Sequence, residues 1–203
     1  MKAIHLTVFF LFMITSIACQ SQENKRGYIV EVVDKAPDFS AQLTNGETFN
    51  LKAHRGRVVM LQFTASWCSV CREEMPHIEE EIWQKHKDDD LLVVGIDRDE
   101  PLETVKKFAE QTGITYPLAL DPGAEIFSLY AEKKAGVTRN VLINRKGEIV
   151  FLTRLFNPEE FSALVDKIDE LTYYLETFHK ELKENNLMSI DINTMELKNF
   201  KTE

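Results

Sequence analysis

The chain has 203 residues, of which 44% are hydrophobic and 28% are charged, and its formal net charge at pH 7 is -9. This composition is that of a globular protein. The chain is long enough to form one ordinary domain with extensions and to bury a sizeable core. The acidic balance argues against nucleic acid as a partner, because binding to phosphates needs a basic face.

The first residues have the pattern of an export signal rather than of a folded domain. Lys2 precedes an apolar run from Leu6 to Ile17, which is too short for a comfortable transmembrane span. The run leads into Ala18 and Cys19 and is similar to a bacterial lipoprotein cleavage box, although that pattern prefers Leu where Ser16 stands. We expect a lipid on Cys19, or else ordinary secretion with cleavage nearby. In both cases the mature protein lies outside the cytoplasm, where disulfides persist.

Several segments have the pattern of strands. The β-branched segment Tyr28–Val33 predicts a strand, and Leu43–Phe49 predicts a hairpin because it contains Asn-Gly. Arg57–Phe63 and Leu91–Ile96 are almost continuously apolar, which is typical of strands covered on both faces of a parallel sheet. Val141–Phe151 predicts a further hairpin around Arg-Lys-Gly.

Helices are predicted between these strands. Met75, Ile78 and Ile82 repeat at helical spacing and complete a βαβ unit, and Pro76 is expected to bend this helix. The remaining predicted elements are a helix at Pro101–Gln111, a short strand at Tyr116–Leu120 and a short helix at Ala124–Tyr130.

The last helix is predicted to begin near Pro158, with Asn157 as its N-cap. Its apolar stripe is about three heptads long. The stripe consists of Phe161, Leu164, Ile168, Leu171, Leu175, Phe178 and Leu182. Since a helix that caps one sheet needs only part of this length, two interpretations stay open. The second half folds against its own domain or lies loosely, or it makes a partner contact or a homodimer seam. Residues 185–203 have no assignable role.

Cys68 and Cys71 are separated by two residues and lie where a strand ends and a helix begins. The free N–H groups and the dipole of the helix favour a thiolate at Cys68, whereas Cys71 is about one turn further in and less exposed. We predict that Cys68 attacks a partner disulfide and that Cys71 resolves the mixed disulfide, leaving a Cys68–Cys71 disulfide. In reverse, the same pair oxidises dithiols.

At these residues the chain resembles the thioredoxin superfamily and, more closely, the extracytoplasmic TlpA/ResA-like thiol:disulfide oxidoreductases (redoxins) in a lipoprotein form. The resemblance covers roughly residues 36–171. It rests on Ala36–Phe39 (APDF), Phe63–Arg72, Glu73–Pro76 (EEMP) and Val141–Phe151. It implies an α/β fold: a thioredoxin-like central mixed sheet flanked by helices, with an N-terminal β-hairpin extension and a long C-terminal helix.

The resemblance also implies supporting residues and a division of the chain. Trp67 corresponds to the family's Trp before the first Cys, and Glu74 to an acidic residue that tunes the cysteine pair. Either could instead be ordinary, Trp67 as a packed aromatic and Glu74 as a solvated helix residue. The expected segments are a signal peptide at 1–18, a lipid-anchored tether and first strand at 19–35, a thioredoxin-like domain at 36–172, and a C-terminal helix extension and tail at 173–203.

The chain departs from the family pattern at two positions. Val70 stands where the family usually has Pro, at a position that influences the redox potential. Thr138 stands where the family has a cis-Pro facing the cysteines, six residues before Asn144. Because a non-proline cis bond is costly, we expect a trans bond at Thr138. The redox role survives both changes, but the choice of partner becomes open.

Metal sites fit this sequence poorly. Zinc needs about four ligands, and the chain has neither a second cysteine pair nor an HxxxH cluster. His77 is expected to be a surface residue. A copper chaperone on this fold would need a distant His, and none lies between Lys87 and Phe178. We therefore expect no metal and no organic cofactor.

The predicted function is disulfide exchange with protein partners in the cell envelope, as a reductase supplied by an upstream protein electron donor. The protein is expected in the periplasm or at a membrane surface. A peroxiredoxin-like thiol peroxidase stays open, with Arg139 as its arginine, although Ala65 stands where such enzymes place Thr. A lipid-anchored binding or sensor module on the same fold also stays open.

Overall fold

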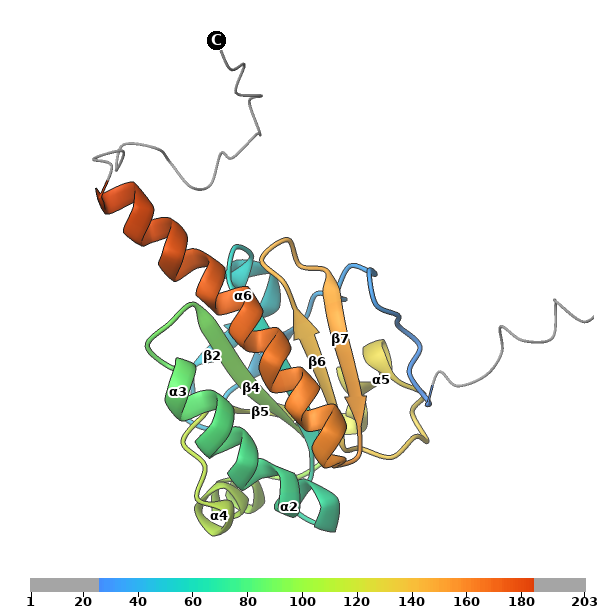
Figure 1. Cartoon of the computed structure of the whole chain (residues 1–203). Coiled ribbons are helices and arrows are strands. Elements are labelled where there is room, and N and C mark those ends of the chain that lie inside the picture. The colour runs from blue at the N-terminus through green and yellow to red at the C-terminus, as the bar shows by residue number, and fades with distance from the viewer. Residues whose placement is uncertain (1–25, 185–203) are drawn as a thin grey trace, which may run out of the picture.

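The computed structural model describes residues 26–184, and a five-stranded sheet in the order β5-β4-β3-β6-β7 lies at its centre (Figure 1). The strands are β3 (Val58–Thr64), β4 (Leu91–Arg98), β5 (Leu118–Asp121), β6 (Arg139–Ile143) and β7 (Ile149–Arg154). Strands β3, β4 and β5 pair in parallel, whereas β3 with β6 and β6 with β7 pair antiparallel. This mixed sheet flanked by helices confirms the predicted fold class.

The helices cover both faces of the sheet. They are α2 (Ser69–His77), α3 (Gln84–His86), α4 (Leu102–Thr112), α5 (Phe127–Tyr130) and α6 (Pro158–Glu184). On one face, Thr64 of β3 contacts Met75 of α2. On the other face, the ring of Phe63 packs against Phe127 of α5. All seven residues of β3 are buried, as predicted for a strand covered on both faces.

The helix after the cysteines is irregular where Pro76 was expected to bend it. Pro76 lies inside α2, and a π-helical turn, η2 (Ile78–Trp83), links α2 to α3. Proline removes a helical hydrogen bond, and π-turns are common where a helix is distorted. Ile78 and Ile82 of this turn are buried, so the distortion keeps the apolar side chains on the core.

Both predicted hairpins are confirmed. Strands β1 (Ser40–Gln42) and β2 (Thr48–Asn50) pair antiparallel around Gly46, whose φ of 90° is the left-handed value that glycine allows. A 3₁₀ turn, η1 (Leu51–His54), then leads to β3. The short helix α5 is preceded by a second 3₁₀ turn, η3 (Pro122–Ala124).

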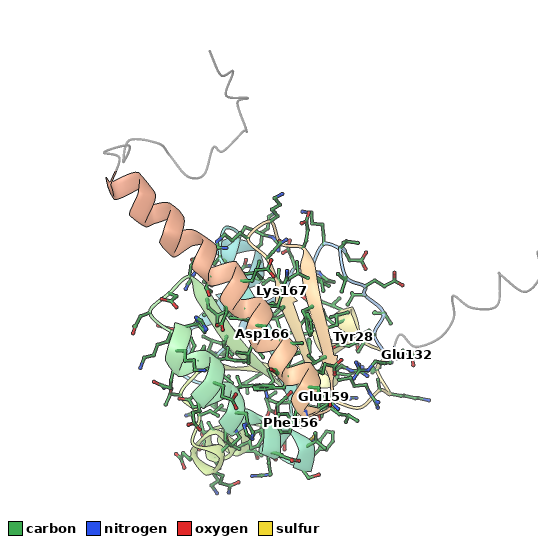
Figure 2. All side chains as sticks on the ribbon, in the orientation of Figure 1. Tyr28, Glu132, Phe156, Glu159, Asp166 and Lys167 are labelled. Carbon is green, nitrogen blue, oxygen red and sulfur yellow. The ribbon has the colours of Figure 1, made fainter. Side chains whose placement is uncertain are left out.

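The predicted strand at Tyr28–Val33 is wrong. Tyr28 makes only an isolated bridge with Ala131, and Val33 has a φ of 79°, which a strand does not accommodate. The segment runs as irregular backbone along the outer edge of β7, and Tyr28 lies beside this strand (Figure 2). Its β-branched composition is that of a strand, but its hydrogen bonds to neighbouring segments are scattered and form no continuous ladder.

Helix α6 confirms the predicted N-cap, because Asn157 Oδ1 accepts a hydrogen bond of 2.9 Å from the Glu160 amide. The first half of its stripe is buried through Phe161, Leu164 and Ile168. The side chains beyond residue 172 lie outside those described, although the ribbon continues past the sheet to Glu184 (Figure 1). Charged side chains such as Asp166 lie on the side of α6 away from the sheet (Figure 2).

In the described part of the chain, no helix has both the length and the apolar character needed to cross a membrane. The predicted signal peptide and Cys19 lie outside the described residues, as do residues 185–203. Their predicted roles therefore stay predictions.

Candidate active site

The two cysteines lie at the start of α2, directly after the central strand β3. Cys68 is the N-cap residue, and its Sγ accepts a hydrogen bond of 3.3 Å from the amide of Cys71. A helix N-terminus offers unsatisfied N–H groups and a positive dipole end, and both stabilise negative charge. Both cysteines are free thiols in this structure; Cys71 is buried and Cys68 is partly exposed.

Thr138 bridges the two sulfurs. Its Oγ1 lies 3.1 Å from the Sγ of Cys68 and 3.2 Å from the Sγ of Cys71. The expected trans bond is confirmed, because residues 26–184 contain no cis peptide bond. A hydroxyl can donate to one sulfur while accepting from the other, so Thr138 can follow a change of protonation in the pair.

These contacts make the two thiols unequal. The hydrogen bond from Cys71 is the largest of the effects that lower the pKa of Cys68 to about 6, with Thr138 and the amides of Cys71 and Val70 adding to it against the opposing effect of burial. Burial raises the pKa of Cys71 far above that of an ordinary thiol. Near neutral pH the pair is therefore one accessible thiolate and one buried thiol, which is the asymmetry predicted from the sequence.

Glu74 is not a solvated helix residue, because only 1% of its surface is exposed. Its Oε1 accepts a hydrogen bond of 2.7 Å from Nδ2 of Asn140, and its Oε2 accepts one of 3.3 Å from Nε2 of Gln62. Burial raises the pKa of Glu74 to about 7 even though both hydrogen bonds act to lower it. Glu74 can therefore bind and release a proton at neutral pH.

The polar side chains that surround the carboxyl group of Glu74 were not predicted from the sequence. Gln62 on β3 and Asn140 on β6 are directly paired in the sheet. Tyr116 donates a hydrogen bond of 2.7 Å to Gln62, and Asn140 donates one of 2.9 Å to Thr153. One signal was present in the sequence, because Gln62 is a polar residue within an otherwise apolar strand run.

The surface around Cys68 is open and partly apolar. Trp67 is 64% exposed, so the alternative of a packed aromatic is wrong. Leu155 is 44% exposed, and its amide donates a hydrogen bond of 3.1 Å to the carbonyl of Thr138. Trp67 directly precedes Cys68 in the sequence, and Leu155 follows β7. Both side chains leave apolar surface that a partner can cover.

Arg139 and His77 are not part of this site. The Arg139 guanidinium lies 4.5 Å above the Tyr28 ring, and its Nε donates to the carbonyl of Gly136. His77 is exposed, as expected, and lies 2.8 Å from Glu81. Within residues 26–184, no group of three or more His, Cys, Asp or Glu side chains is arranged to hold a metal ion.

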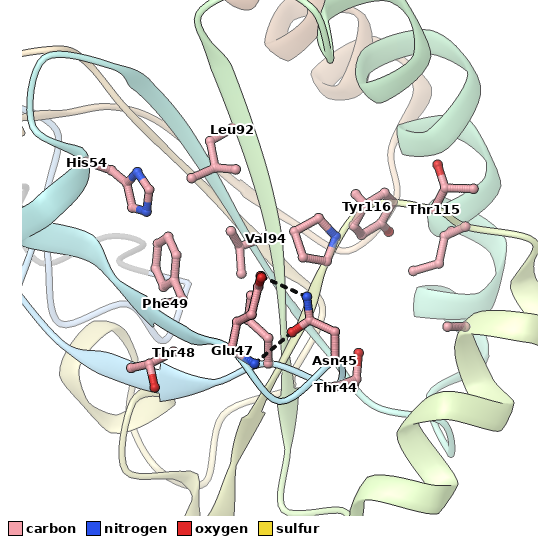
Figure 3. A pocket seen from close by; sticks show the side chains of 14 residues that line it. Thr44, Asn45, Glu47, Thr48, Phe49, His54, Leu92, Val94, Thr115 and Tyr116 are labelled. Carbon is pink, nitrogen blue, oxygen red and sulfur yellow. Dashed lines mark hydrogen bonds between the residues drawn. The ribbon is translucent and has the colours of Figure 1, made fainter.

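A hollow of about 710 Å³ lies away from the cysteines, between the β1–β2 hairpin and the α4–β5 connection (Figure 3). Phe49 and Val94 line it together with His54, whose ring stacks on Phe49. Neither Cys68, Cys71, Glu74 nor Thr138 is among its lining residues. The hollow is therefore separate from the dithiol site.

A mixed sheet with two unequal thiols at the start of the helix after its central strand defines a thioredoxin-fold dithiol protein. The profile of the Redoxin family matches residues 31–168. The chain is 31% identical to the thiol-disulfide oxidoreductase ResA of Bacillus thuringiensis subsp. konkukian over 121 residues, which cover 60% of this chain and 68% of ResA. It is 32% identical to ResA of Geobacillus kaustophilus over 120 residues, covering 59% and 67%.

Solved structures agree with this match. A proposed protein disulfide isomerase from Bacteroides thetaiotaomicron has a TM-score of 0.71 and 59% identity, covering 75% of this chain and 97% of that one. A proposed thiol:disulfide interchange protein DsbE from Chlorobium tepidum has a TM-score of 0.61 and 30% identity, covering 68% and 96%. The chain belongs to the Redoxin family, and within the thioredoxin superfamily to the TlpA/ResA-like enzymes, as its motifs predicted.

Proposed function

We propose that this chain is a thiol:disulfide oxidoreductase that exchanges disulfides with protein partners in the cell envelope. The observation that carries the proposal is the pair of unequal thiols at the N-terminus of α2. Cys68 is partly exposed and activated, Cys71 is buried, and the hydroxyl of Thr138 contacts both sulfurs. Exchange needs a thiolate that reaches a partner and a second thiol that releases it. The names of the relatives support the same chemistry.

The reaction has two steps. The Cys68 thiolate attacks one sulfur of a partner disulfide, a mixed disulfide forms, and one partner thiolate leaves. The Cys71 thiol loses its proton and attacks the sulfur of Cys68, so that the second partner thiolate leaves and a Cys68–Cys71 disulfide remains. Two electrons have then passed from the dithiol to the partner. Glu74, whose pKa near 7 suits it to accept a proton, takes up the proton that Cys71 releases.

Direction, location and assembly are proposals of the same kind. The resemblance supports net reduction, with electrons from an upstream protein donor, since thiol exchange needs no metal or organic cofactor. The N-terminal pattern supports export and a lipid on Cys19. The length of α6 beyond the sheet supports a homodimer seam past Leu171. Truncation at Leu171 is expected to convert a dimer into a monomer, and an unchanged number of subunits in the native assembly would count against the seam.

Covalent trapping tests the function. With Cys71→Ser, the mixed disulfide on Cys68 cannot be resolved, so partners should accumulate as adducts that a reductant releases. The matched control is Cys68→Ser combined with Cys71→Ser, which should trap nothing. If the Cys71→Ser protein traps no partner in its native envelope, and the wild type reduces no protein disulfide, the binding or sensor module becomes the better interpretation.

The peroxidase alternative lacks its supporting side chains. Ala65 stands three residues before Cys68, and the hydroxyl of the neighbouring Thr64 lies 3.4 Å from the sulfur of Met75 instead of contacting Cys68. Arg139 packs on Tyr28. Peroxide consumption by the reduced protein is therefore expected to be no faster than that of a free thiol, and a faster rate would restore this alternative.

A further inference from the structure

A second buried carboxyl lies near the cysteines, on the opposite side of β3 from Asn140. Asp97, near the end of β4, has no exposed surface, and its side chain lies beside Thr64 on the sheet face that α2 covers. Neither of its carboxyl oxygens meets a hydrogen-bond donor among the described residues. A buried carboxylate without donors is costly, so the environment of Asp97 requires an explanation.

A neutral Asp97 accounts for these contacts. Burial raises the pKa of Asp97 to about 8, and the charge of Glu100 and a side-chain hydrogen bond with Glu100 raise it further in the same direction. Protonated Asp97 is itself a donor and can donate to a carboxyl oxygen of Glu100. Near neutral pH Asp97 therefore keeps its proton.

Glu100 in turn holds the loop that carries Cys68. Its Oε2 accepts a hydrogen bond of 2.5 Å from the amide of Ser66, and its Oε1 accepts one of 2.6 Å from the Ser66 hydroxyl. The carbonyl of Ser66 accepts a hydrogen bond of 2.7 Å from Nε of Arg72. Ser66 is two residues before Cys68, so these bonds fix the backbone immediately ahead of the attacking sulfur.

We infer that protonated Asp97 donates a hydrogen bond to Glu100, that Glu100 positions Cys68 through Ser66, and that loss of the Asp97 proton in alkaline solution releases this loop. The inference rests on the proposed function in taking Cys68 as the attacking thiol. Asp97 and Glu100 are positioning residues, since neither makes a hydrogen bond to a cysteine sulfur within residues 26–184. Their role is distinct from that of Glu74, which lies over the Gln62–Asn140 pair.

Once Asp97 has lost its proton, the neighbouring charges repel its carboxylate. Besides Glu100, the charge that acts on Asp97 is that of Asp121 at the end of β5, and both are negative. On β3 the paired residue is Thr64, which does not titrate, and the buried residues of α4 are apolar. The nearby cations are engaged elsewhere. Arg72 bonds Ser66 and Gln111, and Arg98 bonds the carbonyls of Lys133 and Ala135.

The pH profile separates this pair from the other titrating groups. The pKa of Cys68 is about 6 and that of Glu74 is about 7. If Asp97 had no influence, the Cys68 thiolate would therefore react at a constant rate from about pH 8 upward. We expect instead that the rate constant of the reduced wild type with a small aromatic disulfide falls roughly threefold to tenfold above about pH 8, the effect of one lost hydrogen bond.

The experiment compares wild type with Asp97→Asn. The amide of Asn still donates to Glu100 but cannot lose a proton. The variant should therefore keep its rate constant through the alkaline range. Glu103→Gln, which changes a side chain that is 81% exposed on α4, is the matched control and should behave like the wild type. Glu74→Gln should retain the alkaline fall.

A second measurement reports on the loop without thiol chemistry. Hydrogen exchange of the Ser66 amide, followed by NMR and corrected for the intrinsic pH dependence, should lose protection roughly tenfold in the wild type at the midpoint seen in the rates. The loss should be absent in Asp97→Asn. If that variant does not fold, Ser66→Ala removes one of the two bonds to Glu100 and should lower the protection of this amide at neutral pH.

The outcomes are distinct. An alkaline fall that persists in Asp97→Asn, or a wild type without any fall in rate or protection, overturns the inference, as does unchanged protection in Ser66→Ala. A wild type whose Cys68 reacts at no pH contradicts the proposed function instead. The exchange profile of Ser66 then still decides whether Asp97 and Glu100 hold the loop.

Discussion

Nδ2 of Asn140 donates a hydrogen bond of 2.7 Å to Oε1 of Glu74 in a region closed to solvent. The donor lies on strand β6 and the acceptor on helix α2, so the bond joins two parts of the chain that are 66 residues apart. It fixes an ionisable group one helical turn from Cys71, where low polarity makes its charge expensive.

Replacing Glu74 by Gln should change how stability depends on pH. Burial raises the pKa of Glu74 from 4.5 to about 7. A raised pKa means that the folded state binds the proton more tightly, so this stabilisation is complete below about pH 4.5 and is lost as the pH rises to about 7. Because Gln does not titrate, the stability of Glu74→Gln relative to wild type should increase by about 3 kcal/mol over this window.

Urea unfolding at a series of pH values measures this effect. Glu73→Gln is the matched control, because Glu73 is the exposed neighbour on the same helix. Its difference from wild type should not vary with pH over this window. A pH-independent difference for Glu74→Gln as well would mean that Glu74 titrates normally in the folded protein.

Thr138→Val should remove the hydroxyl while keeping the shape of the side chain. Since this hydroxyl contacts the sulfur of Cys68 at 3.1 Å, its loss should raise the pKa of Cys68 by about one unit. A less stable thiolate also makes the reduced form less stable, so the reduction potential should fall by about 30 mV.

The ultraviolet absorbance of the thiolate and equilibration with a thiol buffer measure these two quantities. Thr48→Val, on the exposed part of β2, serves as the control and should alter neither. A Cys68 pKa that stays at its wild-type value in Thr138→Val would show that the threonine contact does not stabilise the thiolate.

Trp67→Ala should separate protein substrates from small ones. Trp67 is 64% exposed beside Cys68, so a protein partner can cover it, whereas a small disulfide needs only the sulfur. Loss of one exposed aromatic contact should lower kcat/KM for a protein disulfide about tenfold. The rate with a small disulfide should stay within about twofold. Equal losses for both substrates would indicate a disturbed thiol rather than a lost docking contact.

Most elements of the fold could be predicted because their signals are local. The apolar runs of β3 and β4, the Asn-Gly turn of the hairpin and the N-cap at Asn157 each carry their structure in a few adjacent residues. Tyr28–Val33 has equally strong β propensity, yet the left-handed φ of 79° at Val33 breaks the extended backbone and its hydrogen bonds to neighbouring segments are scattered.

The thiols could be predicted for the same reason, but the acids around them could not. Glu73 and Glu74 are adjacent and identical in type, and only Glu74 is buried. What distinguishes them is the position of Gln62 and Asn140 on other strands, which the helix pattern does not contain. The role of Glu100 depends in the same way on Ser66, whose amide and hydroxyl donate to its carboxylate from another segment of the chain.

Tyr28→Phe should destabilise the protein through the segment that was expected to be a strand. The Tyr28 hydroxyl donates a hydrogen bond of 2.6 Å to the carbonyl of Thr153, and the ring supports Arg139. Loss of the hydroxyl should cost about 1–2 kcal/mol in urea unfolding. Ile29→Ala, at a neighbouring exposed position, should change stability by less than about 0.5 kcal/mol. Similar effects from both variants would remove the special role of the hydroxyl.

The same segment has a consequence for self-association. Strand β7 is the last strand of the sheet, and its outer edge would offer unpaired backbone groups to a second chain. The amide of Val33 donates a hydrogen bond to the carbonyl of Ile149, and the carbonyl of Asp34 accepts one from the amide of Ile149. The guanidinium of Arg26 donates one to the carbonyl of Arg154. The segment thus closes the edge at which cross-β aggregates would otherwise nucleate, and irregular backbone does this without offering a new strand edge of its own.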